Sequence, residues 1–174
     1  MKKISAQSLS LALALAVLAP LVQAATTVEF VKPQSGYRDI VRDGHDESQT
    51  LDLLKDHIVK QAEKSVPAGA SLDIKITDVD LAGDQMRRAS MTRDVVVARD
   101  IDWPAISLSY TLKNAAGELL MQKDTVVKDM SYLQHSNRYP SDDFLRYEKR
   151  MLDTWLASGL KTAKKKAAAA SSSK

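Results

Sequence analysis

The chain has 174 residues and no cysteine, which suits one domain with short extensions and excludes disulfides, thiolate metal sites, a lipid-modified cysteine and covalently attached c-type haem. Its formal net charge of +3 comes from the ends, because all 22 acidic residues lie between Glu29 and Asp153, whereas seven lysines lie near the two termini. The central part is therefore mildly acidic, which excludes a basic nucleic-acid-binding body.

Residues 1–24 have the pattern of a secretory signal peptide. Two lysines near the start are followed by an apolar run from Leu9 to Val22, and Val22-Gln23-Ala24 supplies the spacing that a signal peptidase recognises. The run is shorter than the about 20 apolar residues of a membrane-spanning helix. We expect cleavage after Ala24 or Ala25, a periplasmic or secreted protein, and no transmembrane segment after cleavage.

The first expected elements are a strand and a helix. Thr27–Val31 contains β-branched and aromatic residues, which favours a short strand. Ser48–Ser65 has apolar residues at helical spacings of three and four, with Ser48 as candidate N-cap and acidic residues just before it. Pro67 ends this helix.

Alternating polar and apolar residues predict further strands. Ser71–Thr77 is one, and 106–113 with 119–127 form a hairpin around a turn at 114–117. Val95–Ala98 is a further short strand, preceded by a polar linker over 82–93.

A second helix is expected to begin at Ser141 and to end near Gly159. Its apolar face comprises Phe144, Tyr147, Met151, Leu152, Trp155 and Leu156. Residues 161–174 form a low-complexity basic tail. The predicted architecture over 26–160 is a single α+β domain, a two-layer sandwich in which two main helices pack on one face of an antiparallel or mixed sheet.

The stretch "LDIKITDVDLAGD" (72–84) has two interpretations. An uninterrupted strand would bury Asp78 and Asp80 beside three apolar residues and expose Val79 and Leu81, at a cost of several kcal/mol per unpaired carboxylate. A bulge or strand end near Thr77 would invert the phase, so that the carboxylates turn outward.

The alternative interpretation is a cation site made by Asp78, Asp80 and Asp84. Carboxylate oxygens suit Ca²⁺ or Mg²⁺, but Ala82 and Ala89 occupy the fifth and twelfth positions, at which the calcium-loop pattern requires ligands. The residues therefore predict no cofactor, and leave Ca²⁺ or Mg²⁺ open.

Other candidate binding residues are Asp102, Trp103 and Tyr132. Asp102 could complete a carboxylate pair if it lay near Asp80, and Trp103 could cover the sheet edge. The Tyr132 hydroxyl is expected to be hydrogen-bonded as the segment around it docks. The three histidines match no zinc spacing, and His57 is expected to be partly exposed on its helix.

Several segments together resemble a family of small exported bacterial proteins known as domain of unknown function 3016. They are "VEFVKPQSGYRDI", "VPAGASLDIKITDVDLAGD", "DWPAISLSYTL", "DMSYL" and "YEKRMLDTWL", and they span about Val28 to Leu156. The resemblance implies export and one domain, and brings no activity, substrate or catalytic residue.

No complete catalytic constellation is present, which favours a non-enzymatic module that binds an envelope protein, for example by strand addition to an exposed sheet edge. Two alternatives remain: a metal-binding protein or metal-assisted hydrolase that uses the aspartates, and a small-ligand carrier with a pocket near Tyr110, Tyr132 and Trp155. The sequence does not determine the oligomeric state.

Overall fold

The computed structural model describes most of the expected domain. The described residues are 24–31, 36–37, 40–42, 44–86 and 95–161. The expected signal peptide up to residue 23 and the tail beyond residue 161 lie outside the described residues.

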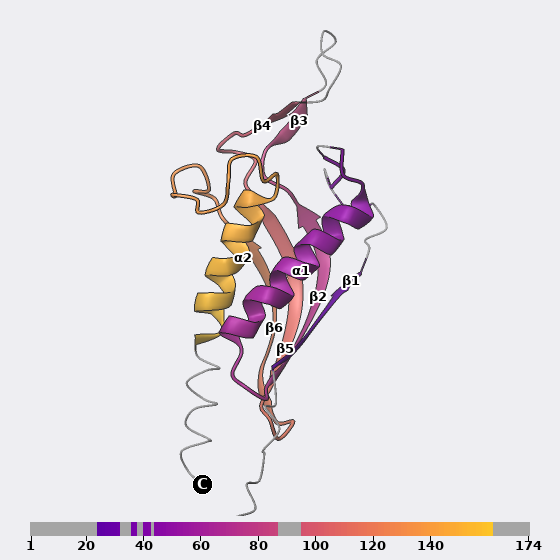
Figure 1. Cartoon of the computed structure of the whole chain (residues 1–174), viewed down its shortest axis with the longest axis vertical. Coiled ribbons are helices and arrows are strands. Elements are labelled where there is room, and N and C mark those ends of the chain that lie inside the picture. Colours follow the sequence, from indigo (N-terminus) through magenta and orange to yellow (C-terminus); the bar gives the residue numbers. More distant parts are fainter. Residues whose placement is uncertain (1–23, 32–35, 38–39, 43, 87–94, 162–174) are drawn as a thin grey trace, which may run out of the picture.

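Six strands and two helices follow one another along the chain (Figure 1). They are β1 (Ala25–Phe30), α1 (Glu47–Ser65), β2 (Ser71–Asp80), β3 (Asp84–Met86), β4 (Val95–Val97), β5 (Ala105–Lys113), β6 (Leu119–Lys128) and α2 (Arg146–Gly159). Four strands form one sheet in the order β1-β2-β5-β6, and β3 pairs with β4. Because β1 is parallel to β2 while β2–β5 and β5–β6 are antiparallel, the sheet is mixed.

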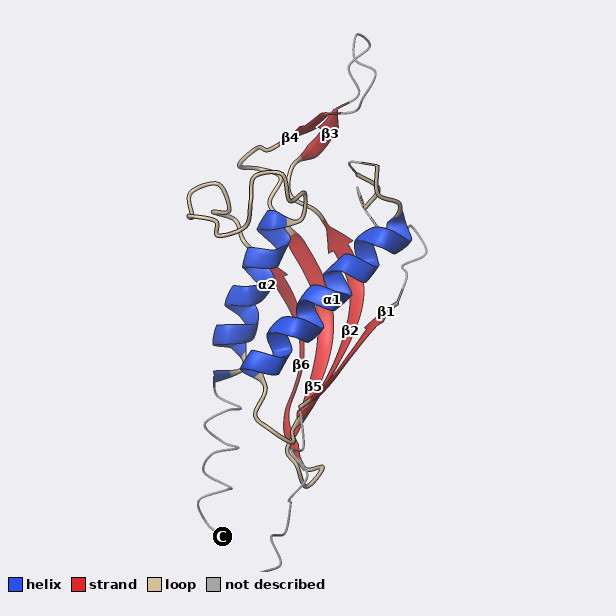
Figure 2. Ribbon diagram, viewed as in Figure 1, coloured by secondary structure: helices blue, strands red, loops and turns tan. Residues whose placement is uncertain are grey.

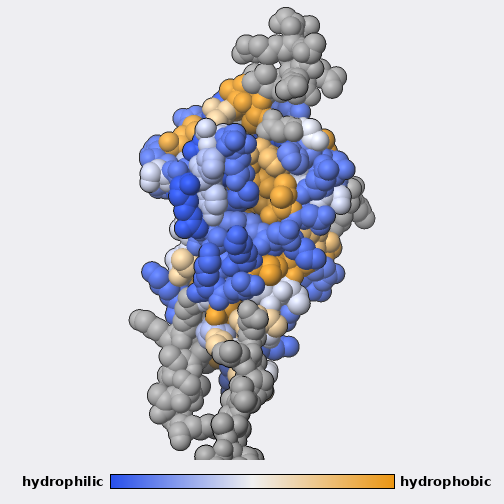
Figure 3. All heavy atoms as spheres, in the orientation of Figure 1, coloured by the Kyte–Doolittle hydropathy of each residue, from blue (hydrophilic) through white to orange (hydrophobic). Residues whose placement is uncertain are grey.

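Both helices lie on one face of the sheet, which confirms the predicted α+β two-layer arrangement (Figure 2). The alternation in β2 explains this packing, since Leu72, Ile74 and Ile76 are almost fully buried while Lys75 between them is exposed. From the helix side the surface is mostly hydrophilic, with apolar side chains showing between α1 and α2 (Figure 3).

The phase of β2 inverts at the predicted position. Ile76 pairs with Leu108, but Asp78 already pairs with Ser107, so Thr77 is the extra residue of a bulge. Val79 then turns inward and is fully buried. The interpretation of this stretch as a bulged strand is confirmed.

The N-terminus of α1 differs from the prediction. Asp46, not Ser48, is the N-cap: its side chain accepts a hydrogen bond from the Gln49 backbone N–H at 2.8 Å. The Gln49 side chain in turn accepts from the Asp46 N–H at 3.0 Å. This reciprocal pair satisfies two backbone donors, which is why the helix begins upstream of Ser48.

The predicted start of α2 at Ser141 is wrong. The helix begins at Arg146, because Asp143 caps a preceding turn: its Oδ1 accepts from the Leu145 N–H at 3.1 Å. Phe144 therefore lies before the helix, where it stacks on His45 with ring centroids 4.3 Å apart. The linker prediction over 82–93 is also partly wrong, since β3 lies within it.

Candidate functional site

The acidic segment places some of the predicted site residues around one polar hollow. Asp80, Asp84, Asp102 and Trp103 line a depression of about 330 Å³ beside the start of β3. Asp78 lies two residues before Asp80 on β2 and is not among its lining residues.

Arg99 lies between two of these carboxylates. Its Nη2 contacts Asp84 Oδ2 at 2.6 Å, and its Nε contacts Asp102 Oδ2 at 2.6 Å. The guanidinium offsets part of the negative charge of the two carboxylates and occupies one oxygen of each that a cation would need. Among the residues that the structure describes, no group of three or more histidine, aspartate or glutamate side chains is placed to hold a metal ion.

Tyr132 contacts the backbone of Arg99 beside this hollow. Its side chain is nearly fully buried, and its hydroxyl donates to the Arg99 carbonyl at 2.8 Å. The Tyr147 ring packs edge-on against it, with centroids 4.8 Å apart. The expected hydrogen bond of the Tyr132 hydroxyl is thus present, and the residue positions the backbone that carries Arg99.

Two buried charged residues hold the backbone between β2 and β3. Arg42, which is 3 % exposed, donates from Nη1 to the Ala82 carbonyl at 2.5 Å and from Nη2 to the Gly83 carbonyl at 2.8 Å. From the other side, Glu148 Oε1 accepts from the Ala82 N–H at 2.7 Å. We call this arrangement the Arg42–Glu148 clasp.

The clasp was absent from the sequence prediction. Burial raises the pKa of the Glu148 carboxyl above its ordinary value, while the Ala82 N–H and Arg42 oppose that shift. One signal was available: Glu148 precedes Met151 and Leu152 by three and four residues, so it lies on the apolar stripe of α2. A charged residue on that stripe requires a buried partner.

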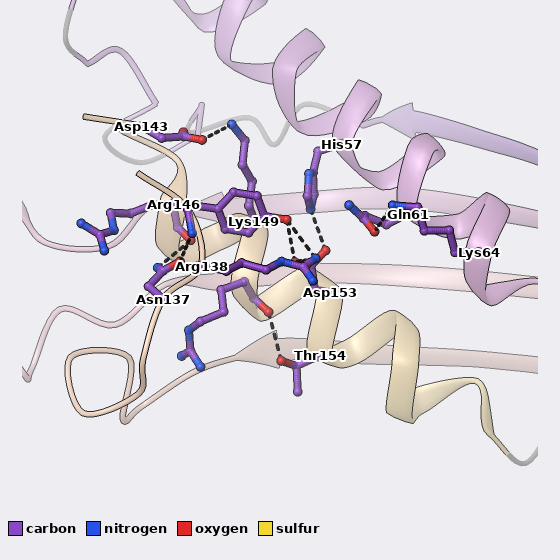
Figure 4. Close-up of polar contacts among 12 residues, drawn as sticks. His57, Gln61, Lys64, Asn137, Arg138, Asp143, Arg146, Lys149, Asp153 and Thr154 are labelled. Carbon is purple, nitrogen blue, oxygen red and sulfur yellow. Dashed lines mark hydrogen bonds and ion pairs between the residues drawn. The ribbon is translucent and has the colours of Figure 1, made fainter. Parts of the chain in front are cut away.

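A second polar cluster joins α1, α2 and the segment before α2 (Figure 4). His57 Nε2 lies 3.0 Å from Asp153 Oδ1, and Asp153 Oδ2 accepts from the Tyr139 hydroxyl at 2.7 Å and from Arg138 Nη2 at 2.5 Å. His57 is only 9 % exposed, so the expectation of a partly exposed histidine is wrong.

The His57–Asp153 contact joins α1 to α2. Lys149, which also influences the pKa of His57, lies on α2 like Asp153. Burial lowers the pKa of His57 despite the neighbouring Asp153 carboxylate. The arrangement therefore fastens the two helices together, as an interior polar network does.

Another concave surface among the described residues lies between α2 and the end of β6. This hollow of about 390 Å³ is lined on the strand side by residues 126–129 and His135, and on the helix side by Arg150, Met151, Thr154, Trp155 and Ser158. We call it the β6–α2 groove. Its floor is apolar, since Val127 and Met151 are buried, and Thr154 and Ser158 are exposed at its wall.

Several polar side chains that line the groove already have partners within the protein. The Thr154 and Ser158 hydroxyls donate to the Arg150 and Thr154 carbonyls of their own helix, at 3.0 and 2.6 Å. At one end, Arg150 contacts Asp129 and approaches His135 Nδ1 to 3.0 Å. Of the proposed carrier residues, Trp155 packs on Tyr110 with centroids 5.5 Å apart.

None of the helices formed by the described residues is long and apolar enough to cross a membrane. No curated protein matches this chain. The family model described as "Protein of unknown function (DUF3016)" matches residues 24–158, which include all the described strands and helices except the last residue of α2. The match covers well over half of the chain, and the chain therefore belongs to the DUF3016 family.

Proposed function

We propose that this chain is a non-enzymatic binding module, periplasmic or secreted, that docks an extended segment of another envelope protein. The segment adds to the free side of β6 and fills the β6–α2 groove. The observation that carries the proposal is that an edge strand and a groove of about 390 Å³ lie side by side.

The sheet edge supplies the main-chain part of the recognition. Among the described strands β6 pairs only with β5, so in this part of the chain the outer side of β6 presents its N–H and C=O groups to an incoming strand. An added strand directs alternate side chains to the same face. Those side chains would meet the apolar floor of the groove, as in recognition by strand addition.

β6 is better suited to this role than β1, the other edge. β6 has ten residues and β1 has six, so an added strand can form more main-chain hydrogen bonds along β6. Val126 pairs with Ser107 and faces away from the helices, and its 54 % exposure leaves apolar surface along this edge for a partner.

The charges on β6 favour a different protein over a second copy. Lys123 pairs with Tyr110 and so faces the helices, whereas Asp124 pairs with Ser109 and faces away. In a symmetric dimer, two copies of β6 would pair antiparallel, and opposed residues would have to point to the same face of the joined sheet. The two such registers with the longest overlap place Lys123 opposite Lys123 or Asp124 opposite Asp124. Like charges directly opposite one another destabilise such a pair.

The proposal is tested by blocking the groove without disturbing the core. Thr154→Arg adds a long side chain at the exposed groove wall, and Ala157→Arg places the same charge on an exposed position of α2 outside the groove. Displayed random ten-residue peptides would be selected against the wild-type protein, and the dissociation constants measured by fluorescence anisotropy.

We expect Thr154→Arg to weaken binding by at least about tenfold, corresponding to roughly 1.4 kcal/mol, and Ala157→Arg to leave it within about twofold. Equal effects of the two variants would place the peptide elsewhere. Failure to select any peptide, together with no partner in a crosslinking experiment on the native envelope, would contradict the docking function.

A further inference from the structure

One hydrogen bond beyond the β5–β6 ladder shows which residues of β6 point their main-chain groups to the free edge. The Asp129 N–H donates to the Pro104 carbonyl at 3.2 Å, one step beyond the pair formed by the last residue of β6 and the first residue of β5. In an antiparallel pair, hydrogen-bonded and non-hydrogen-bonded residue pairs alternate. Lys128, Val126 and Asp124 therefore belong to non-hydrogen-bonded pairs, and their N–H and C=O groups point to the free edge.

The same three residues form a row on the sheet face away from the helices, because each pairs with a β5 residue that alternates with the buried ones. All three are exposed, and Asp124 and Val126 border a hollow of about 530 Å³ over Ser107 and Ser109. Lys128 and Asp124 are four residues apart, about 13 Å along a strand. Neither contributes to the ion pairs among the described residues. The row thus presents a free cation, an apolar side chain and a free anion.

We propose that the docked segment runs antiparallel to β6 and carries an acidic, an apolar and a basic side chain at alternate positions, opposite Lys128, Val126 and Asp124. The proposal rests on the docking function above and gives it a sequence pattern and a direction. Opposite charges directly across an antiparallel pair stabilise it, and like charges destabilise it. The antiparallel direction is slightly more stable per residue than the parallel one.

The residues between these three positions face the groove, because successive side chains of a strand point to opposite faces. They lie opposite Val127 and Thr125, on the side where Met151 and Trp155 line the groove, and apolar side chains suit them. Read from its N-terminus, the expected pattern of the docked segment is acidic, apolar, apolar, apolar and basic.

A second copy of β6 matches these charges only in a shifted register, with Lys128 of one copy opposite Asp124 of the other. That register pairs residues 124–128 of the two strands and leaves the first half of each β6 unpaired. A separate segment can pair along all ten residues of β6, which favours a different protein as the occupant.

The first test uses ten-residue peptides selected from a random library against the wild-type protein. We expect enrichment of an acid and a base four positions apart, with the acid first. Each selected peptide is then compared with a version in which the acid and the base are exchanged, so that composition and net charge are unchanged. Two attractive pairs become repulsive, and the exchange should weaken binding by about tenfold.

Exchanging the charges of the protein as well provides a rescue that a merely structural effect would not produce. The double variant Asp124→Lys with Lys128→Glu should bind the exchanged peptide about tenfold more tightly than the original one. The double variant Lys113→Glu with Asp52→Lys is the matched control, since these exposed residues lie at the opposite end of the sheet and on α1. It should keep the preference of the wild type for the original peptide. Equal weakening of both peptides by the first double variant would overturn the pattern.

The contrary results separate the pattern from the docking function. If the exchange of charges in the peptide changes nothing while Thr154→Arg still blocks binding, the pattern is overturned and docking stands. A preference of the wild type for the exchanged peptide would overturn the antiparallel direction. A dimer in light scattering that Lys128→Glu dissociates would place a second copy on the row and overturn the proposed occupant. If the library yields no peptide, docking itself fails, and the pattern fails with it.

Discussion

The backbone around Gly83 leaves no room for a side chain. Its φ is +78°, and an added Cβ would lie 2.8 Å from the Val97 carbonyl oxygen and 3.2 Å from Ala98 Cα. Both atoms belong to backbone, so neither can be relieved by a rotamer change. The left-handed conformation costs a residue other than glycine about 1–2 kcal/mol. Displacing packed backbone adds about 1–3 kcal/mol.

We therefore predict that Gly83→Ala lowers the free energy of unfolding by about 2–5 kcal/mol. Gly117→Ala is the matched control, because Gly117 has φ +81° but an added Cβ there meets nothing within 4 Å. That variant should lose only the conformational part, about 1–2 kcal/mol. Urea unfolding followed by circular dichroism measures both values.

The difference between the two variants isolates the close approach of Gly83 to the backbone at the end of β4. In a domain of this size 1 kcal/mol corresponds to about 2–4 °C in Tm, so thermal unfolding resolves it independently. Equal losses for Gly83→Ala and Gly117→Ala would refute the reasoning, since they would show that the backbone near Val97 accommodates a methyl group without cost.

Three further predictions concern the clasp, the helix interface and the acidic hollow. Glu148→Ala leaves the Ala82 N–H and Arg42 without this carboxylate, and should lower the free energy of unfolding by about 3–5 kcal/mol. Glu148→Gln keeps an acceptor oxygen and should lose less stability in the same urea assay. An unfolding free energy of Glu148→Ala equal to that of the wild type would contradict the clasp. Burial lowers the pKa of His57, so the histidine takes up a proton more readily in the unfolded chain than in the native state. The free energy of unfolding should therefore fall as the pH drops below about 6.5, the ordinary pKa of histidine. His57→Gln should flatten that dependence, and an equally steep pH profile in the variant would assign it to other groups. Chelation followed by return of Ca²⁺ or Mg²⁺ should leave the Tm unchanged because Arg99 pairs with Asp84 and Asp102; a rise of several degrees that Asp80→Asn abolishes would argue for a cation site.

The parts of the fold that follow local periodicity were predictable from the sequence. The bulge near Thr77 is the clearest case, because the parity of one strand forced a choice between buried carboxylates and buried Val79. The β5–β6 hairpin is similar: its alternation and turn residues place both strands, and the Gly117 N–H bonds to the Asn114 carbonyl at 2.9 Å.

The parts that depend on distant partners were not predictable. Arg42 and Ala82 are 40 residues apart, and Ala82 and Glu148 are 66 apart, so no local pattern joins them. β3 has three residues and exists because β4 pairs with it. The start of α2 was misplaced because Ser141 with Asp143 two residues later has the pattern of an N-cap followed by a first-turn acid, whereas Asp143 caps the preceding turn.

The candidate site was likewise predictable only in part. The sequence analysis singled out four aspartates as candidate site residues. Three of them, Asp80, Asp84 and Asp102, line one hollow, and Asp78 does not. It anticipated an exposed edge strand, but not that α2 would create a groove beside β6. That groove joins residues from two elements whose packing depends on the whole core.

Hydrogen exchange of the β6 amides, with and without a selected peptide, tests the central claim most directly. Strand addition predicts that the outward-facing amides of β6 exchange more slowly in the complex, while those of β1 are unchanged. Tight binding with unaltered exchange along β6, or with slowed exchange along β1, would contradict docking at the β6–α2 groove.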